Sequence, residues 1–393
     1  MQKFIIVGGG ARGIFFSEIL ENELNCKVLA IMDKFVEGNP FIEARLKEAK
    51  IEGVEIYNDL EAMLEKYPSD SVDGAFIMTP EWTHLSVFKR LTQGNYNIFL
   101  EKPIATTKEA ILEIGEIAKH YPKVIQVGFV MRYSPFYRKI KAWINENDMG
   151  RIAHIQMSER LTVAHGTKFK RSWHRMKEFT GGFMNEKCSH DLDMMCWIKE
   201  KDAQPLGVMS MGTRAFARDS IGQTSCSSCP DKKCIYREDI TQYAKYHEGK
   251  VLLDSTAGGV NECIYGNSSD IHDTQSVMVL FDDGTHGIFS VIAMSGKDGR
   301  DIMIHFEYGM IYGDLEAGDL TKIDYRTNQT EKYHISGMNF HGGGDTTVVR
   351  EFAECSLNGT KPVASVEDGL RASLLAFCAD ESIESKTFVR LPE

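Results

Sequence analysis

The sequence has neither a long hydrophobic run nor an excess of positive charge. Its 393 residues include 45 lysines and arginines against 56 aspartates and glutamates, a formal net charge of −11. Nucleic acids and anionic membrane surfaces attract basic patches, so this balance argues against both as partners. No run approaches the roughly 18 apolar residues that span a bilayer, and the apolar stretch after Met1 is too short for a signal peptide. We therefore expect a cytoplasmic protein.

Disulfide bonds are not expected either. The chain has nine cysteines, and in a reducing compartment these are free thiols or metal ligands rather than a disulfide framework. Hydrophobic residues make up 42% and charged residues 26% of the chain, the balance of an ordinary globular protein. At this length we expect two domains.

The first part of the chain alternates short apolar runs with amphipathic stretches. This rhythm is typical of a doubly wound parallel sheet, whose strands are apolar throughout because helices cover both faces. Thr106 and Glu109 form a capping-box pair that predicts a helix from about Thr107. The strand-like runs cover residues 4–7, 27–32, 54–57, 74–78, 98–100 and 124–129.

A second pattern starts after Gly150. Longer strand-like runs cover residues 206–212, 274–281 and 286–294, and the last two are joined by the turn residues of a hairpin. Two helical patterns, at 346–357 and 366–385, close the chain. These features predict a mainly antiparallel open sheet with helices.

We therefore predict an α/β protein of two domains. An N-terminal Rossmann domain with a doubly wound parallel sheet would cover residues 1–127. A C-terminal α/β domain with a mainly antiparallel open sheet would cover residues 128–393. A cysteine-containing insertion lies around residues 220–267 of this second domain.

Gly8, Gly10 and Gly13 fit the pattern G-x-G-x-x-G directly after the first strand-like run. In this context the first glycine permits a tight turn, the second lets the backbone approach a pyrophosphate, and the third lets the helix pack on the strand. The predicted helix over residues 11–20 begins with Ala11 and Arg12, and its N-terminus would present free N–H groups to the phosphates. The motif predicts a dinucleotide site.

Asp33 ends the second strand-like run, twenty residues after Gly13. A carboxylate there accepts hydrogen bonds from both ribose hydroxyls of NAD and repels the 2′-phosphate of NADP. Lys34 follows at once and would soften that repulsion. We therefore favour NAD as the cofactor, with NADP as the alternative.

Two further motifs lie at the edge where open α/β sheets bind ligands. Thr79-Pro80 follows the fourth run, with His84 one helical turn further, and Glu101-Lys102-Pro103 follows the fifth. Together with the glycine fingerprint, these motifs resemble the Gfo/Idh/MocA oxidoreductases, NAD(P)-dependent enzymes that act mostly on sugars and cyclitols. The resemblance covers nearly the whole chain. It implies that residues 1–127 bind NAD(P) and that residues 128–393 serve substrate binding and oligomerisation. It implies a homodimer or homotetramer, and a cofactor site that includes Thr79, Pro80, His84, Glu101 and Lys102.

The segment Met184–Trp197 carries Glu186, His190 and Asp193 at helical spacing. If this segment is one helix, the three side chains share a face. Loss of a hydride from an alcohol leaves a proton to remove, and histidine is the natural base near neutral pH, with a neighbouring carboxylate to orient the ring. The family motif, Gly-Gly followed by Asp-x-Gly-x-His-x-x-Asp, maps the catalytic acid onto Glu186 and the histidine onto His190. Here glutamate replaces the aspartate and Cys188 replaces the glycine.

We expect Lys102 to act as a pair with His190. An ammonium near the nicotinamide would hydrogen-bond the substrate oxygen and stabilise the alkoxide as the hydride leaves. The sequence leaves open which of the two takes the proton. An aromatic ring beside polar groups suits a sugar, so the predicted substrate contacts are Trp173, His174, Arg175 and Asp193. A basic surface loop is the alternative for the first three.

Cys226-x-x-Cys229 is followed by Cys234 and later by Cys263. Three thiols within nine residues have the spacing of ligands in a tetrahedral sulfur site, which predicts a structural zinc. Unligated thiols or a disulfide, and an iron–sulfur cluster, are the alternatives. Further along, His341-Gly-Gly-Gly-Asp345 is either a turn into a helix capped by Asp345 or a site whose backbone N–H groups bind an anion or a sugar hydroxyl.

The predicted function is NAD-dependent oxidation of a secondary hydroxyl on a sugar, aminosugar or cyclitol, at a site between the two domains. The alternative is an NAD-retaining hydrolase, lyase or epimerase that oxidises a carbohydrate transiently and then reduces it again, because the same residues serve both outcomes. A module that only senses dinucleotide or sugar is disfavoured, since Lys102, Glu186 and His190 occur together.

Overall fold

Two compact units make up the computed structural model, which describes residues 1–34, 41–146, 148–216, 225–237, 261–265, 269–337 and 340–392. The first unit combines Met1–Phe129 with Asp345–Leu370. The second holds the described residues between these segments and the C-terminal residues from Arg371. This division differs from the expected cut after residue 127, because a segment near the C-terminus returns to the first unit.

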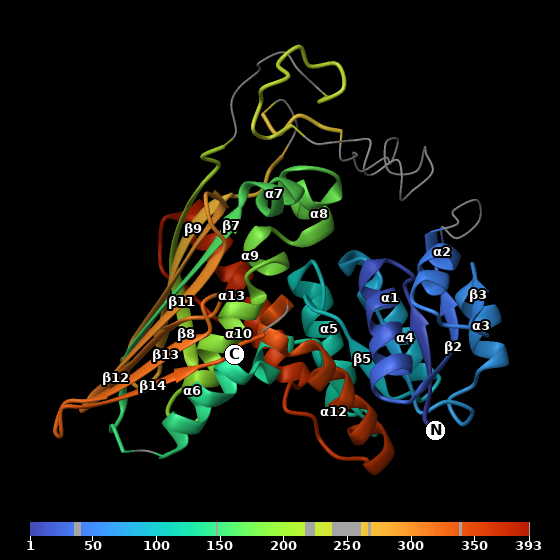
Figure 1. Cartoon of the computed structure of the whole chain (residues 1–393), viewed down its shortest axis with the longest axis horizontal. Helices are drawn as coiled ribbons and strands as arrows, with labels where there is room; N and C mark the ends of the chain where they lie inside the picture. Colours follow the sequence, from blue (N-terminus) through green and yellow to red (C-terminus); the bar gives the residue numbers. More distant parts are fainter. Residues whose placement is uncertain are drawn as a thin grey trace. The chain divides into compact units, whose positions relative to one another are not determined.

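The first unit is built on a parallel sheet of six strands with the order β3-β2-β1-β4-β5-β6. This is the strand order of the Rossmann fold, so the predicted doubly wound sheet is confirmed. Every residue of β4 and β5 is buried, as expected when helices cover both faces. The strands are β1 (Lys3–Val7), β2 (Lys27–Met32), β3 (Glu55–Tyr57), β4 (Gly74–Ile77), β5 (Ile98–Leu100) and β6 (Ile125–Val127) (Figure 1).

The helices of the first unit follow its strands. The predicted cap of α5 was one residue early, since Thr107 is the N-cap and its hydroxyl accepts a hydrogen bond from the Ala110 N–H. The helices are α1 (Ala11–Glu18), α2 (Phe41–Glu48), α3 (Leu60–Lys66), α4 (His84–Gln93), α5 (Lys108–Lys119) and α12 (Asp345–Asn358), with a π-helical turn η1 (Ile19–Glu23) and a 3-10 turn η2 (Glu81–Thr83).

Helix α12 completes the core of the first unit although it comes late in the chain. The Phe352 ring lies 4.9 Å from that of Phe76 and 5.6 Å from that of Phe99 between centroids. The Gln126 amide also donates a hydrogen bond to the Val348 carbonyl at 2.9 Å. Edge-to-face aromatic pairs of this kind add to the stabilisation from burial.

The second unit is built on a mixed sheet of nine described strands, in the order β14-β13-β12-β11-β7-β10-β9-β8-β15. Only β10 and β7 pair in parallel, so the predicted mainly antiparallel sheet is confirmed. The strands are β7 (Ile152–Thr162), β8 (Pro205–Thr213), β9 (Thr274–Phe281), β10 (His286–Ser295), β11 (Gly299–Phe306), β12 (Gly309–Asp314), β13 (Asp319–Asp324), β14 (Gln329–His334) and β15 (Val389–Arg390).

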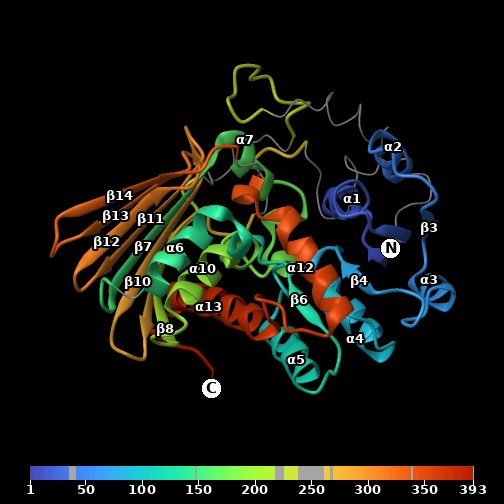
Figure 2. The same ribbon diagram turned by 60° about the horizontal axis from the view of Figure 1, so that its bottom comes forward.

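Long helices cover one face of this sheet: α6 (Pro135–Glu146), α10 (Ser189–Lys199) and the later part of α13 (Val366–Ser385) (Figures 1 and 2). The Ser210 N–H of β8 donates to the Ser382 hydroxyl of α13 at 3.0 Å. The shorter helical segments are η3 (Val130–Tyr133), α7 (Val163–Gly166), η4 (Thr167–Lys170), η5 (Trp173–Arg175), α8 (Lys177–Thr180), α9 (Phe183–Glu186) and η6 (Phe340–Gly343). None of the helices in the described residues is long and apolar enough to cross a bilayer.

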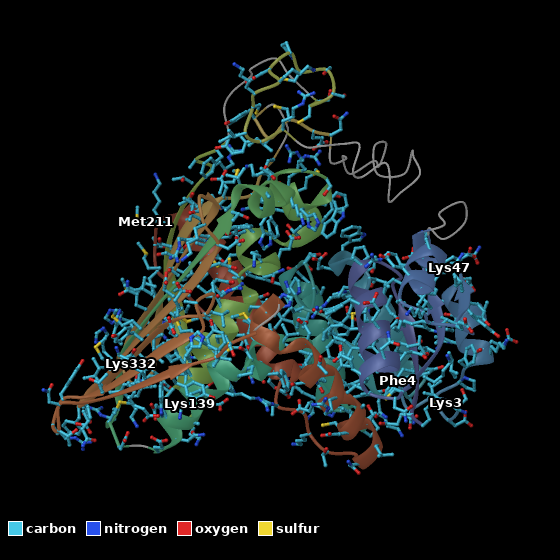
Figure 3. The ribbon with its side chains drawn as sticks, in the orientation of Figure 1. Lys3, Phe4, Lys47, Lys139, Met211 and Lys332 are labelled. Carbon is cyan, nitrogen blue, oxygen red and sulfur yellow. The ribbon has the colours of Figure 1, made fainter. Side chains whose placement is uncertain are left out.

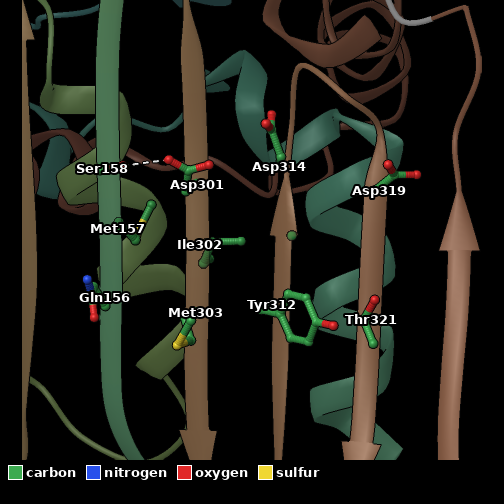
Figure 4. A pocket seen from close by; sticks show the side chains of 11 residues that line it. Gln156, Met157, Ser158, Asp301, Ile302, Met303, Tyr312, Asp314, Asp319 and Thr321 are labelled. Carbon is green, nitrogen blue, oxygen red and sulfur yellow. Dashed lines mark hydrogen bonds between the residues drawn. The ribbon is translucent and has the colours of Figure 1, made fainter.

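The other face of the sheet is open. Strand pairing places one row of side chains across it, and the row runs through Met209, Met278, Gln156, Met303 and Tyr312. A hollow of about 450 Å³ lies over β7, β11, β12 and β13 on this face (Figure 4). Met211 on β8, which is 77% exposed, extends the same apolar surface (Figure 3).

Candidate active site

Close backbone contacts shape the glycine loop between β1 and α1. Gly8 has a φ of +114°, and a Cβ atom there would lie 2.5 Å from the Met78 carbonyl carbon. A Cβ on Gly13 would lie 2.0 Å from the Gly8 carbonyl oxygen, so α1 packs on this loop only without a side chain at that position. A Cβ on Gly10 would meet no atom within 4 Å, which leaves open space beside its backbone.

The start of α1 fits a pyrophosphate. Gly10 is the N-cap of this helix and has no side chain to bind the first N–H groups of Ala11 and Arg12. These N–H groups and the positive end of the helix dipole favour a phosphate. The donor set, the open space at Gly10 and the cramped Gly8 and Gly13 are therefore what a dinucleotide requires.

Asp33 follows β2 and lies beside the glycine loop. Its Oδ2 accepts a hydrogen bond from the Gly9 N–H at 2.9 Å, and its own N–H donates to the Tyr57 carbonyl at 2.8 Å. This contact places the carboxylate next to the loop, as a ribose contact requires. Lys34 is exposed, and residues 35–40 after it lie outside the described residues.

Glu101 connects the glycine loop to the Glu-Lys-Pro turn. The Arg12 Nε donates to its Oε1 at 2.6 Å, and the Lys102 N–H donates to its Oε2 at 2.6 Å. Arg12 also pairs with Asp345 at 2.7 Å, at the start of α12. Burial opposes the charge of Arg12, but Glu101 and Asp345 raise its pKa above the ordinary value. Glu101 therefore holds the backbone of Lys102 in place. The sequence predicted only a contact between Glu101 and the cofactor.

His84, at the first position of α4, is buried against two backbone carbonyls. Its Nε2 lies 2.8 Å from the Thr79 oxygen and its Nδ1 lies 3.0 Å from the Pro103 oxygen. Burial lowers the pKa of His84, and a neutral imidazole donates only one of these two hydrogen bonds. Both ring nitrogens contact backbone carbonyls, so His84 positions the turn that carries Lys102. Its predicted contact with the cofactor stays a prediction.

The single helix predicted over Met184–Trp197 is two helices in the structure. Helix α9 ends at Glu186, and α10 begins at Ser189 with Cys188 as its N-cap. The backbone turns between them, so Glu186, His190 and Asp193 do not share one continuous helical face. Each of these side chains has a different partner.

Glu186 contacts a histidine that the sequence analysis assigned to the substrate. Its Oε1 is in direct contact with the Nδ1 of His174, and the His174 ring stacks on Trp173 with 3.6 Å between centroids. Ser172 just before them has a φ of +52°, which residues other than glycine rarely adopt. Strain of this kind gathers at functional sites. Glu186 thus has a described contact with His174, and its predicted pairing with His190 stays a prediction.

His190 lies in the first turn of α10 and is 3% exposed. Its ring lies 5.6 Å from the His341 ring between centroids. His341 has a φ of +54°, and the next two glycines, Gly342 and Gly343, also have positive φ. The Ser134 hydroxyl donates to the Gly342 carbonyl at 2.8 Å and holds this turn. The glycine run therefore brings a second imidazole to His190, which sequence reasoning missed because it weighed only a turn or an anion site.

Asp193 and Arg175, both predicted as substrate contacts, are paired within the protein. The Arg132 guanidinium binds both carboxylate oxygens of Asp193, at 2.6 and 2.8 Å, and neither side chain is more than 2% exposed. Arg175 pairs with Glu262 at 3.1 Å. The predicted substrate contact of Asp193 is corrected to a structural role, because its carboxylate is buried in a bidentate ion pair. The substrate contact of Arg175 stays a prediction.

A charge-balanced cluster lies beneath the break between α9 and α10. Glu159 binds Lys187 at 2.7 Å and also Arg300, which binds Asp191 at 3.1 Å. Burial raises the pKa of Asp191 to about 6. Burial also raises the pKa of the Cys188 thiol, so Cys188 is a packed residue rather than a reactive thiolate. The cluster fixes the backbone that presents Glu186 and His190.

Family models match both units of the chain. The model of the oxidoreductase family's NAD-binding Rossmann fold matches residues 2–129, and that of the family's C-terminal alpha/beta domain matches residues 141–391. The chain belongs to the Gfo/Idh/MocA family of oxidoreductases. The resemblance predicted from the glycine, Thr-Pro and Glu-Lys-Pro motifs is thereby confirmed, and the protein is an oxidoreductase with an NAD-binding Rossmann fold.

Members of this Gfo/Idh/MocA family resemble the chain over most of its length. YteT of Bacillus subtilis, an oxidoreductase by name, is 25% identical over 304 residues, which cover 68% of this chain and 69% of YteT. The myo-inositol 2-dehydrogenase of Thermotoga maritima is 21% identical over 99% of this chain and 98% of its own. A levoglucosan dehydrogenase structure, in complex with NADH and L-sorbose, has a TM-score of 0.78 at 16% identity and covers 100% of this chain and 99% of its own. These values establish a common fold.

The cysteine cluster lies in the second unit of this Gfo/Idh/MocA protein. Its four thiols line one cavity of about 90 Å³, together with Arg171 and Arg237. None of the nine cysteines forms a disulfide bond. The four predicted ligands, Cys226, Cys229, Cys234 and Cys263, are therefore brought together from two separate segments of the chain.

Proposed function

We propose that this oxidoreductase transfers hydride between nicotinamide and a secondary hydroxyl of a sugar, aminosugar or cyclitol. The observation that carries the proposal is the buried His190, with a second imidazole beside it, in a chain that belongs to the Gfo/Idh/MocA family. The relatives named for myo-inositol and levoglucosan support the substrate class. The proposed location is cytoplasmic, because nine cysteines without a disulfide bond suit a reducing compartment.

The proposed cofactor is NAD. The backbone from Gly8 to Gly13 would hold its pyrophosphate, and Asp33 its adenosine ribose. The Asp33 carboxylate beside the Gly9 N–H favours NAD because it would repel a 2′-phosphate. Thr79 and Pro80, at the end of β4, would line the same edge of the sheet.

Lys102 and His190 handle the proton as a pair in the proposed mechanism. When bound, NAD supplies the hydride acceptor. A ring nitrogen of His190 takes the hydroxyl proton, and the Lys102 ammonium donates a hydrogen bond to the same substrate oxygen as negative charge develops there. Glu101 keeps the Lys102 backbone in place through its contact with the N–H.

Side chains around Glu186 provide the proposed substrate contacts. The Trp173 ring would meet the apolar face of a sugar, and His174, held by Glu186, would bind a hydroxyl. His341 would bind a second hydroxyl or share the proton of His190. Asp193 has a supporting role, because it orients Arg132.

The open sheet face supports a homodimer or homotetramer. Three side chains of the row from Met209 to Tyr312 are at least 38% exposed, namely Met209, Met278 and Tyr312. Apolar patches of this kind mark surfaces that pair with another protein. Light scattering of the purified protein tests this proposal, and a monomer at micromolar concentration would rule it out.

The decisive experiment follows the reduced-nicotinamide absorbance while the purified protein and NAD meet sugars, aminosugars and cyclitols, with products identified in parallel. Net formation of NADH with an oxidised product is expected. A product without net NADH would instead support the NAD-retaining hydrolase, lyase or epimerase. Absence of any product across the panel would leave the carbohydrate class without support.

A further inference from the structure

The described part of the cysteine-containing insertion has almost no regular structure of its own. Residues 225–237 and 261–265 contain no helix or strand, and one antiparallel bridge joins Ser225 to Glu262. The Cys226 N–H donates to the Asn261 carbonyl at 2.7 Å, which brings the first cysteine of the motif alongside the segment that carries Cys263. A segment with so little core commonly depends on a covalent or metal cross-link for its stability.

Backbone turns present the other thiols to the same cavity. The Cys229 N–H approaches the Cys226 carbonyl at 3.4 Å, and the Arg237 N–H donates to the Cys234 carbonyl at 3.0 Å. Cys226 and Cys263 are buried, and Cys229 and Cys234 are half-buried. The spacings C-x₂-C and C-x₄-C lie within the range that zinc sites use. Two turns and one bridge therefore direct four thiols into a single cavity.

Two arginines border the cavity that the four thiols line. Arg171 is 2% exposed, and its Nη2 lies 3.7 Å from the Cys226 sulfur while its Nε donates to the Glu262 carbonyl at 2.9 Å. Arg237 lines the same cavity. Both guanidinium groups therefore lie where the sulfur ligands of a metal would be. Four thiolates around a divalent ion carry two negative charges, and the two arginines would balance them.

We propose that Cys226, Cys229, Cys234 and Cys263 bind one Zn²⁺ as four thiolates, and that this ion holds the insertion together. The proposal is independent of hydride transfer. Zinc–sulfur bonds of about 2.3 Å place tetrahedral ligands about 3.8 Å apart. Among the described residues, only Glu159, Cys188 and Asp191 form a group of three metal-ligating side chains with ligand atoms within 4.8 Å of one another, and Lys187 and Arg300 already neutralise that group. The four thiols line one cavity but lie further apart than this. Zinc binding would therefore draw them together and close the cavity.

Metal content of the full-length protein tests the site directly. After removal of any affinity tag, we expect one zinc per chain by inductively coupled plasma mass spectrometry, and loss of most of it in Cys229→Ser and Cys263→Ser. The matched control is Cys355→Ser, which changes a buried thiol on α12 and should keep the metal. Equal zinc loss in the control, iron with acid-labile sulfide, or a mass-spectrometric disulfide between the four cysteines would each overturn the proposal.

A second measurement uses the unaltered chain, in case the serine variants fail to fold. Cobalt added to chelator-treated protein should give the thiolate charge-transfer and d–d bands of a tetrahedral sulfur site, at one equivalent. Zinc added instead should slow amide hydrogen exchange in residues 225–237. No cobalt spectrum would refute the ligand set, and unchanged exchange after zinc binding would refute the stabilising role.

Discussion

The glycine loop of the first unit and the cluster around His190 in the second hold reactive groups in different ways. In the proposed function the loop acts through backbone N–H groups, and its shape depends on the absence of side chains at Gly8 and Gly13. The His190 cluster would act through side chains with partners elsewhere in the chain, such as His341 beside His190 and His174 beside Glu186. A backbone site is therefore sensitive to any added atom, whereas a side-chain site is sensitive to loss of a partner.

Removal of His190 should have the largest effect. His190→Ala is expected to lower kcat by about 100- to 10,000-fold, since a general base contributes that much, and to leave the Kd of NAD nearly unchanged because the loop of the first unit is intact. Steady-state kinetics and a separate NAD titration measure the two effects. His120→Ala, at an exposed position on the first unit, is the control. Wild-type turnover of His190→Ala would remove this residue from the mechanism.

Loss of Asp193 should affect stability rather than substrate binding. Asp193→Ala leaves the buried Arg132 guanidinium without this partner, which costs about 3–5 kcal/mol in the free energy of unfolding. Urea unfolding and Tm measurements detect this loss, and the double variant with Arg132→Met should recover part of it. If Asp193→Ala instead raised KM with an unchanged Tm, the original prediction of a substrate contact would be reinstated.

Substitution of Asp33 tests the carboxylate that lies beside the glycine loop. Asp33→Ala is expected to raise the Kd of NAD by roughly 10- to 100-fold, because two charge-assisted hydrogen bonds to the ribose are lost, and to narrow the preference for NAD over NADP. Fluorescence titration with both cofactors measures this change, with Asp59→Ala as a control on the same unit. Equal binding of both cofactors before and after the substitution would contradict the role of Asp33.

Glu186 should give the smallest effect. Glu186→Gln keeps the shape of the side chain and weakens its hold on His174, so we expect kcat/KM to fall by about tenfold with an unchanged Tm. The kcat/KM of Glu186→Ala should fall further, because the contact with His174 disappears. Identical kinetics for both variants and the wild type would show that the described contact between Glu186 and His174 does not serve catalysis.

The contrast between the two sites also explains what could be predicted from the sequence. The glycines and Asp33 belong to a contiguous motif whose meaning follows from a strand and a helix on either side. The partners of Glu186 and Asp193 depend on tertiary contacts, since Arg132 lies 61 residues before Asp193. Helical spacing predicted one stripe of three side chains, but the backbone turns at Cys188 and gives each its own partner.

Local patterns also fixed the secondary structure better than the domain boundary. The helix predicted over 366–385 has the bounds of α13, and the strand over 274–281 has those of β9. The return of α12 to the first unit has no local signal, because the aromatic contacts of Phe352 are formed with strands that precede it by hundreds of residues.

That return has a consequence for biosynthesis. Because Phe352 fills the space against Phe76 and Phe99, the cofactor-binding unit lacks part of its core until the ribosome has made nearly the whole chain. The unit that is translated first is thus among the last to be completed. Until then, the aromatic side chains of its early strands stay exposed. A nascent chain in this state is prone to aggregation and benefits most from a chaperone.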